Sequence, residues 1–143
     1  MNNIKTQPTF LFWIISVLAA LWNLIGVVAY LGQAYMTDET LTALSESNQL
    51  YYANLPAWVI AAFAIAVFAG FFGSIGLLWR KKWAYYLFVF SFVALLVQSY
   101  YNFFTQDFIK FEGTNIILPM LTFIVALYLI FFANNKIKSG ILS

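Results

Sequence analysis

The chain has 143 residues, of which 64% are hydrophobic, 21% are aromatic and only 8% carry a charge. A soluble domain has about 45–50% apolar and about 25% charged residues, so this chain could not cover a water-exposed surface. Intrinsic disorder requires low hydrophobicity and high charge, which excludes that class too. The composition therefore predicts an integral membrane protein whose residues 1–143 form a single transmembrane domain.

The sequence contains no histidine and no cysteine. This removes the commonest catalytic base, the usual zinc ligands and thiol nucleophiles. The net charge of +2 is small and scattered, which argues against a nucleic-acid partner. The only candidate catalytic groups are three loop carboxylates, Asp38, Glu39 and Glu46, which no nucleophile or metal ligand accompanies. We therefore expect a protein that is not an enzyme and that needs no cofactor or metal.

Charged residues divide the chain into four charge-free stretches of 23 residues or more, namely 6–37, 47–79, 83–106 and 113–135. A helix needs about 20 apolar residues to cross the hydrocarbon core. Strands of a membrane barrel would alternate in polarity, and Val59–Phe72 does not. We predict an all-α, up-down-up-down four-helix bundle whose helices span about 10–33, 55–79, 83–104 and 115–133.

Basic residues predict the orientation of these helices. If the N-terminus is inside, the inside segments hold six of the seven basic residues: Lys5, Arg80, Lys81, Lys82, Lys136 and Lys138. Only Lys110 falls outside. By the positive-inside rule, both termini are expected to be cytoplasmic. The turn at Arg80–Lys82 is a topology signal or a contact for anionic headgroups, and its shortness makes the second and third helices antiparallel neighbours.

The first outside loop, residues 34–54, carries apolar residues such as Leu41, Leu44 and Tyr51 at helical spacing. Acidic residues near its start favour a helix N-terminus. The loop is therefore predicted to contain a short amphipathic helix on the outer membrane surface. Asn54 is expected to cap the second spanning helix.

Aromatic residues gather near both ends of the predicted spans. On the outside they include Tyr51, Tyr52, Trp58 and Tyr101. This distribution is typical of the aromatic belts that anchor helices at the membrane interfaces. A surface that stacks on a ligand is the alternative interpretation.

The second spanning helix carries rows of small residues four apart. Its predicted packing face consists of Ala62, Ala66, Gly70, Gly73 and Ser74. Small residues let helix backbones approach closely in lipid, where hydrophobic burial gives no driving force. Helices of the same chain or a second protomer could fill this face. In either case we expect Gly70→Leu to destabilise the protein and Gly70→Ala to be mild.

Three neutral polar residues are predicted to share one layer of the bundle. At 1.5 Å per residue, Asn23, Gln98 and Thr122 lie roughly 20, 22 and 17 Å from the inner ends of their helices. Unpaired amides in hydrocarbon cost several kcal/mol, so Asn23 and Gln98 are predicted to face inward and Asn23 to find a polar partner. The layer serves either interhelical hydrogen bonding or a site for a polar solute or headgroup.

Three stretches resemble a known group of proteins: WNLIGVVAYLGQAYM at 22–36, PAWVIAAFAIAVFAGFFGS at 56–74 and RKKWA at 80–84. They are similar to small, uncharacterised four-span inner-membrane proteins of Gram-negative bacteria that are loosely labelled sugar transporter. The resemblance implies a multi-pass protein of the bacterial inner (cytoplasmic) membrane. It provides no site residues.

Two functions are compatible with the sequence. The first is a non-catalytic accessory or scaffolding subunit of a larger membrane complex, which the small size, the uncharged spans and the small-residue rows favour. The second is an oligomeric facilitator for a neutral solute such as a sugar, which Asn23, Gln98 and the resemblance favour. A bundle this small has a filled core, so transport would need a second protomer. The expected partners are the lipid bilayer and either another membrane protein or a second copy of this chain.

Overall fold

The computed structural model describes residues 7–143 and is helical throughout, apart from turns and short loops. Four helices in this part of the chain are long and apolar enough to cross a membrane, which confirms the predicted all-α class and the four apolar helices. They are α1 (Phe10–Ala34), α4 (Ala57–Leu78), α5 (Trp83–Tyr100) and α6 (Ile117–Lys138). Lys5, which entered the prediction of orientation, lies outside the described residues.

The ends of the long helices follow local chemistry. α1 begins after Thr9, whose side-chain oxygen accepts a hydrogen bond from the Phe12 amide at 3.1 Å. α5 continues into one π-helical turn, Tyr101–Thr105. α6 follows a 3-10 turn, Gly113–Ile116, and runs five residues beyond the predicted end at residue 133. The thickness of the hydrocarbon core limits the length of the apolar segment but not the length of the helix. Lysines in the last turn of α6 favour its continuation beyond that segment.

The first loop contains two short helices where the sequence predicted one. They are α2 (Asp38–Thr42) and α3 (Glu46–Ala53). The break arises because Ser45 caps a new helix, its hydroxyl oxygen accepting from the Asn48 amide at 3.4 Å. The expected role of Asn54 as a cap for α4 is wrong. Its side chain instead donates to the Leu50 carbonyl oxygen in α3, at 2.8 Å.

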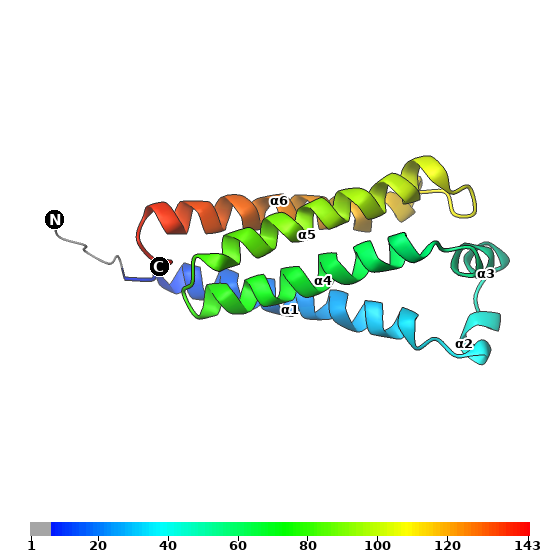
Figure 1. The fold of residues 1–143 in the computed structure, drawn as a ribbon, viewed down its shortest axis with the longest axis horizontal. Coiled ribbons are helices and arrows are strands. Elements are labelled where there is room, and N and C mark those ends of the chain that lie inside the picture. The colour runs from blue at the N-terminus through cyan, green and yellow to red at the C-terminus, as the bar shows by residue number, and fades with distance from the viewer. Residues whose placement is uncertain (1–6) are drawn as a thin grey trace.

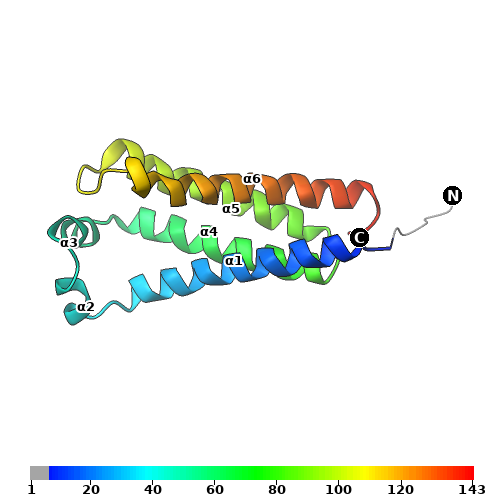
Figure 2. The ribbon, with the colours of Figure 1, turned by 180° about the vertical axis from the view of Figure 1, so that it is seen from behind.

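The chain reverses direction between successive long helices (Figure 1). The α2–α3 loop and residues 106–112 lie at one end, which we call the loop end. The turn at residues 79–82 and the end of α6 lie at the other, which we call the turn end. α4 packs against both α1 and α5, and α5 packs against α6. Figure 2 shows α1 and α6 diverging from the turn end towards the loop end.

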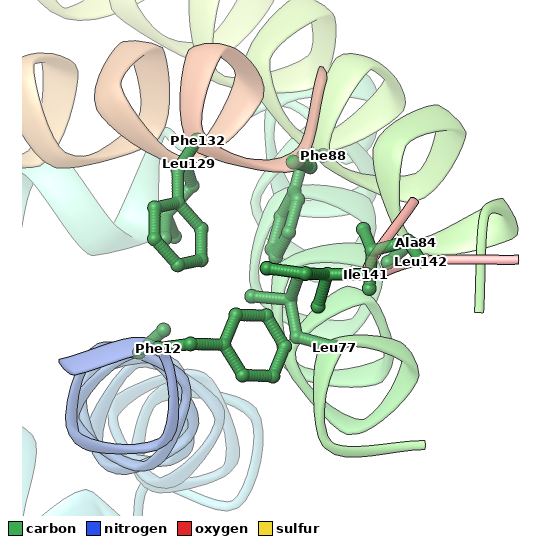
Figure 3. Packing of buried hydrophobic residues seen from close by; sticks show 10 residues of the cluster. Phe12, Leu77, Ala84, Phe88, Leu129, Phe132, Ile141 and Leu142 are labelled. Carbon is green, nitrogen blue, oxygen red and sulfur yellow. The ribbon is translucent and has the colours of Figure 1, made fainter. Parts of the chain in front are cut away.

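Two buried clusters hold the ends of the molecule together. The turn-end cluster joins all four long helices with the residues after α6, as Figure 3 shows for the labelled side chains. It consists of Phe12, Ala19, Leu77, Ala84, Phe88, Leu129, Phe132, Ala133, Ile141 and Leu142. The loop-end cluster is smaller and consists of Tyr51, Val59 and Tyr101.

Candidate functional site

A cavity of about 270 Å³ lies between the four long helices, in the half of the molecule towards the loop end. Most of its wall is apolar, and all four long helices contribute to it. Its polar side chains are Trp22, Asn23, Ser91, Gln98 and Thr122. None of the described residues that line the cavity is ionisable. Its electrostatic character therefore comes only from neutral hydrogen-bonding groups.

The three residues of the predicted polar layer all line this one cavity. Asn23 comes from α1, Gln98 from α5 and Thr122 from α6. Counting residues from the inner helix ends gave them similar depths, and helices that run nearly side by side preserve that depth. The arrangement brings an amide from each of two helices and a hydroxyl from a third to the same space.

The Asn23 amide joins α1 to α4. Its nitrogen donates to the carbonyl oxygen of Ala19 at 2.9 Å and to the hydroxyl oxygen of Ser74 at 3.1 Å. The Ser74 hydroxyl in turn donates to the Gly70 carbonyl oxygen at 2.9 Å. Both amide hydrogens of Asn23 are therefore used within the protein, which satisfies a group that is costly to leave unpaired in lipid.

A second polar contact joins α4 to α5. The Ser91 hydroxyl donates to the backbone carbonyl oxygen of Ala66 at 2.6 Å. Ser91 was absent from the predicted layer because it lies only eight residues after Trp83, roughly 12 Å from the inner end of α5. The cavity extends over several turns of helix, so a search confined to one depth could not find it.

The remaining two members of the layer do not link helices. The Thr122 hydroxyl donates to the Leu118 carbonyl oxygen of its own helix at 2.8 Å. The Gln98 amide has no hydrogen-bond partner among residues 7–143, although it lines the cavity. α6 is instead held by apolar contacts, including the edge-on packing of Phe92 against Phe123 at 6.1 Å between ring centroids.

The predicted packing face of α4 is buried within the chain at all five positions, Ala62, Ala66, Gly70, Gly73 and Ser74. Glycine allows the closest approaches. A Cβ atom at Gly73 would lie 2.9 Å from the Phe88 ring on α5. One at Gly70 would collide with the Asn23 side chain and lie 3.2 Å from the Ser91 hydroxyl oxygen. The expectation that Gly70→Ala is mild therefore needs correction, because alanine there would displace an amide that two hydrogen bonds hold in place.

Residues of the turn-end cluster bound the cavity on one side. Phe88 and Leu129 form part of its wall and also belong to the turn-end cluster. Behind them the Phe12 and Phe132 rings stack at 5.8 Å between centroids and join α1 to α6 (Figure 3). These packed side chains bound the cavity on the side of the turn end.

Residues after α6 complete this closure, which sequence reasoning missed. Ile141 and Leu142 are only 3% and 1% exposed. Gly140 has a positive φ of 82°, and the Ile141 amide donates to the Lys136 carbonyl oxygen at 3.0 Å. This is a Schellman ending, in which a glycine after the helix is followed by an apolar residue that folds back. Residues 139–142, Ser-Gly-Ile-Leu, contain this pattern of a glycine followed by apolar residues, which is the sequence signal for such an ending.

Arg80 fixes the tail to the turn between α4 and α5. Its Nε donates to the Ile141 carbonyl oxygen at 3.1 Å, and its own carbonyl oxygen accepts from the Ser143 amide at 3.0 Å. Arg80 is the non-glycine residue of the described chain with a positive φ, 58°, a backbone conformation that costs about 1 kcal/mol or more for an L-residue. The basic turn therefore has a structural contact in addition to its predicted role in topology.

Aromatic residues close the loop end. The buried Tyr51 of α3 donates from its hydroxyl to the Asn102 side-chain oxygen at 2.7 Å. Burial, together with nearby Tyr52 and Tyr101, raises the pKa of Tyr51 to about 12. Trp58 packs edge-on against Tyr101 at 5.8 Å between centroids. The interpretation of Tyr51 and Tyr101 as interface anchors is therefore wrong, because both are buried among protein side chains.

No protein-family model, curated protein or solved structure matches this chain. The resemblance to four-span bacterial membrane proteins stays a prediction. Within residues 7–143, no group of three or more acidic, histidine or cysteine side chains is placed to hold a metal ion.

Proposed function

We propose that the chain is a non-catalytic accessory or scaffolding subunit of a larger membrane complex in the bacterial inner membrane. The observation that carries this proposal is the packing order of the helices. In the packing order α1–α4–α5–α6, the inner helices α4 and α5 each pack against two neighbours, whereas α1 and α6 are the two edge helices. Edge residues such as Val17, Leu18 and Leu21 of α1 are about half exposed and apolar. In a membrane such a face contacts either acyl chains or other helices, and the proposal assigns it to the transmembrane helices of a partner protein.

The proposed topology is an up-down-up-down bundle with both termini in the cytoplasm and α2 and α3 on the outer surface. The chain has no native cysteine, and Ser47 and Ser139 are both exposed, so single cysteines can be introduced at either position. A membrane-impermeant maleimide should label Ser47→Cys in intact spheroplasts and Ser139→Cys only after the membrane is opened. Labelling of both positions in intact spheroplasts would contradict the topology.

Extraction of native membranes in a mild detergent tests the accessory role. The chain, of 16.3 kDa, should migrate with one larger protein at a fixed ratio. Leu18→Trp on the edge helix α1 should abolish the association, because an indole there would hold a partner helix away. Ile65→Trp, on an exposed position of the inner helix α4, is the matched control and should retain it. A chain that runs alone as a monomer or homodimer would overturn the proposal.

A facilitator for a neutral solute is the second candidate. The convergence of Asn23, Gln98 and Thr122 on one cavity favours it. The packed turn-end cluster lies between the cavity and that end, so transport would need the cluster to open or a second protomer to supply the path. Flux of a labelled neutral sugar into proteoliposomes tests this function. A facilitator predicts that Gln98→Leu loses flux while the protein stays folded, whereas an accessory subunit predicts no flux above that of empty liposomes for either protein.

A further inference from the structure

The cavity opens sideways, between α1 and α6. These helices touch at the stacked rings of Phe12 and Phe132, and they have no extended backbone contact in the described chain. Ile25 of α1 and Leu118 of α6 both line the cavity, yet they are 66% and 64% exposed. Two wall residues with so much free surface mark the mouth. The mouth therefore lies on the side of the bundle, between α1 and α6.

The depth of this mouth places it in hydrocarbon. Ile25 lies 15 residues after Phe10, and Leu118 lies 15 residues before Ala133, which puts each roughly 22 Å from the inner end of its span. The hydrocarbon core is about 30 Å thick. In the proposed topology, a molecule entering between α1 and α6 comes from the acyl chains of the bilayer. Water-soluble molecules have no direct route to this mouth.

The hydrogen bonds that the lining side chains already make within the protein indicate which kind of ligand group the cavity can bind. The amide hydrogens of Asn23 and the hydroxyl hydrogens of Ser91 and Thr122 are all donated within the protein. These three side chains therefore offer only acceptor lone pairs to a ligand. The Gln98 amide and the Trp22 indole also line the cavity and have no hydrogen-bond partner within residues 7–143. The site offers more free acceptors than donors, which fits a ligand group that can itself donate.

The charge and the size of the cavity restrict the chemical class of the ligand further. No ionisable residue lines the cavity, so a phosphate or carboxylate headgroup would lose its hydration without compensation. A hydroxyl both donates and accepts, which matches the acceptors and the free Gln98 amide. A cavity of about 270 Å³ lies just below the usual range for ligand sites, about 300–1,000 Å³. The cavity can hold a small lipid headgroup and the first part of one acyl chain, with the remainder of the lipid in the bilayer.

We propose that this cavity binds an uncharged membrane lipid with a free hydroxyl group, of the diacylglycerol class, which enters from the bilayer between α1 and α6. The inference rests on the proposed membrane topology but not on the accessory role. Failure of the cysteine-labelling experiment would remove the topology, whereas the experiment below tests the ligand on the purified chain without any partner.

Equilibrium binding of tritiated dioctanoylglycerol to the full chain in phosphatidylcholine nanodiscs tests the proposal, with empty nanodiscs as background. Saturable binding is expected. Competition by the unlabelled lipid should be about tenfold stronger than competition by its methyl ether, because the ether cannot donate a hydrogen bond. The corresponding phosphatidic acid should not compete. Equal competition by the lipid and its methyl ether would overturn the hydroxyl assignment, and absence of saturable binding would overturn the site.

Two variants locate the binding. Ala126 lines the cavity, and Ala126→Phe should abolish binding by filling it. Ala61 is exposed on α4 away from the cavity, so Ala61→Phe should leave the dissociation constant within about twofold. Gln98→Leu should weaken binding by about tenfold, the effect of one lost hydrogen bond, and it keeps the test valid if Ala126→Phe does not fold. Unchanged affinity in Gln98→Leu would contradict the proposed contact.

Discussion

The turn end and the cavity half of this molecule use the same four helices in different ways. At the turn end, large rings from α1, α5 and α6 fill the centre, and Ile141 and Leu142 cover them. In the cavity half, the lining mixes small residues such as Gly26 and Gly70 with large ones such as Phe63, and α1 and α6 separate. The comparison shows that the bundle closes where rings of α1 and α6 meet, and that a cavity remains where these two helices diverge, although both halves are apolar.

The polar contacts follow the same division. Hydrogen bonds from Asn23 and Ser91 join α1, α4 and α5 beside the cavity. α6 has no comparable side-chain bond to another long helix among the described residues, and apolar packing and the tail hold it at the turn end. The cavity wall therefore has three helices joined by side-chain hydrogen bonds, and α6, which apolar packing holds.

Phe12→Ala should have the largest effect on stability. Phe12 is 1% exposed in the turn-end cluster, while Phe10, two residues earlier, is 81% exposed. We expect Phe12→Ala to lower the free energy of unfolding by about 2 kcal/mol, below the range for soluble cores because lipid solvates the unfolded helices. Phe10→Ala should change it by less than about 0.5 kcal/mol. Unfolding in mixed micelles measures both, and equal effects would show that the turn end is not a packed core.

A pair of glycine substitutions tests the close approach of α4 and α5. A Cβ atom at Gly76 would lie 2.7 Å from the Trp83 ring and 2.9 Å from the Ala84 Cβ, whereas nothing lies within 4 Å of one at Gly32. Gly76→Ala should therefore destabilise the protein by about 1–2 kcal/mol through overpacking. Gly32→Ala should be neutral or stabilising by up to about 1 kcal/mol through helix propensity. Unfolding in the same mixed micelles measures both, and a stabilised Gly76→Ala would refute the contact.

Two substitutions at Arg80 separate its backbone conformation from its side-chain bond. Both Arg80→Ala and Arg80→Gly lose the bond from Nε to the Ile141 carbonyl oxygen. Only glycine adopts the positive φ of 58° without strain. Arg80→Gly should consequently be more stable than Arg80→Ala by about 1 kcal/mol. Chemical denaturation of the two variants measures this difference, and equal stability would mean that the turn does not keep this conformation.

The smallest effect is expected at the bond between Asn23 and Ser74. A double-mutant cycle with Asn23→Ala and Ser74→Ala should give a coupling of about 0.6 kcal/mol, the average for hydrogen bonds between membrane helices. Asn23→Ala combined with Thr122→Ala provides the control, because these two side chains share the cavity but not a hydrogen bond, and their effects should add. Additive effects in the first cycle would remove the proposed link between α1 and α4.

Sequence reasoning found the four spans because charge and apolar length directly determine which segments can cross a membrane. It brought Asn23, Gln98 and Thr122 to one depth because the helical rise is constant. It could not find the order of the helices or the opening between α1 and α6. Lipid-facing and protein-facing residues in these spans are equally apolar, so their pattern does not distinguish a buried Phe12 from an exposed Phe10.

The burial of Tyr51 and the role of the tail were missed for a related reason. Tyrosine near a helix end suits both a membrane interface and a buried contact, and only the Asn102 side chain across the loop end decides between them. Ile141 and Leu142 are too few to register as a hydrophobic segment, and their burial depends on the position of Arg80 in another turn.

The proposed cavity opens to the hydrocarbon of the bilayer and not to water. Spin labels at Ile25→Cys, at the mouth and 66% exposed, and at the exposed Ser139→Cys beyond the turn end test this directly, because the chain has no native cysteine. In liposomes, the label at residue 25 should be relaxed by oxygen, which concentrates in hydrocarbon, and not by a water-soluble nickel chelate, whereas the label at residue 139 should be relaxed by the chelate. Relaxation of the label at residue 25 by the nickel chelate would instead show that the mouth opens to water and would contradict the proposed site.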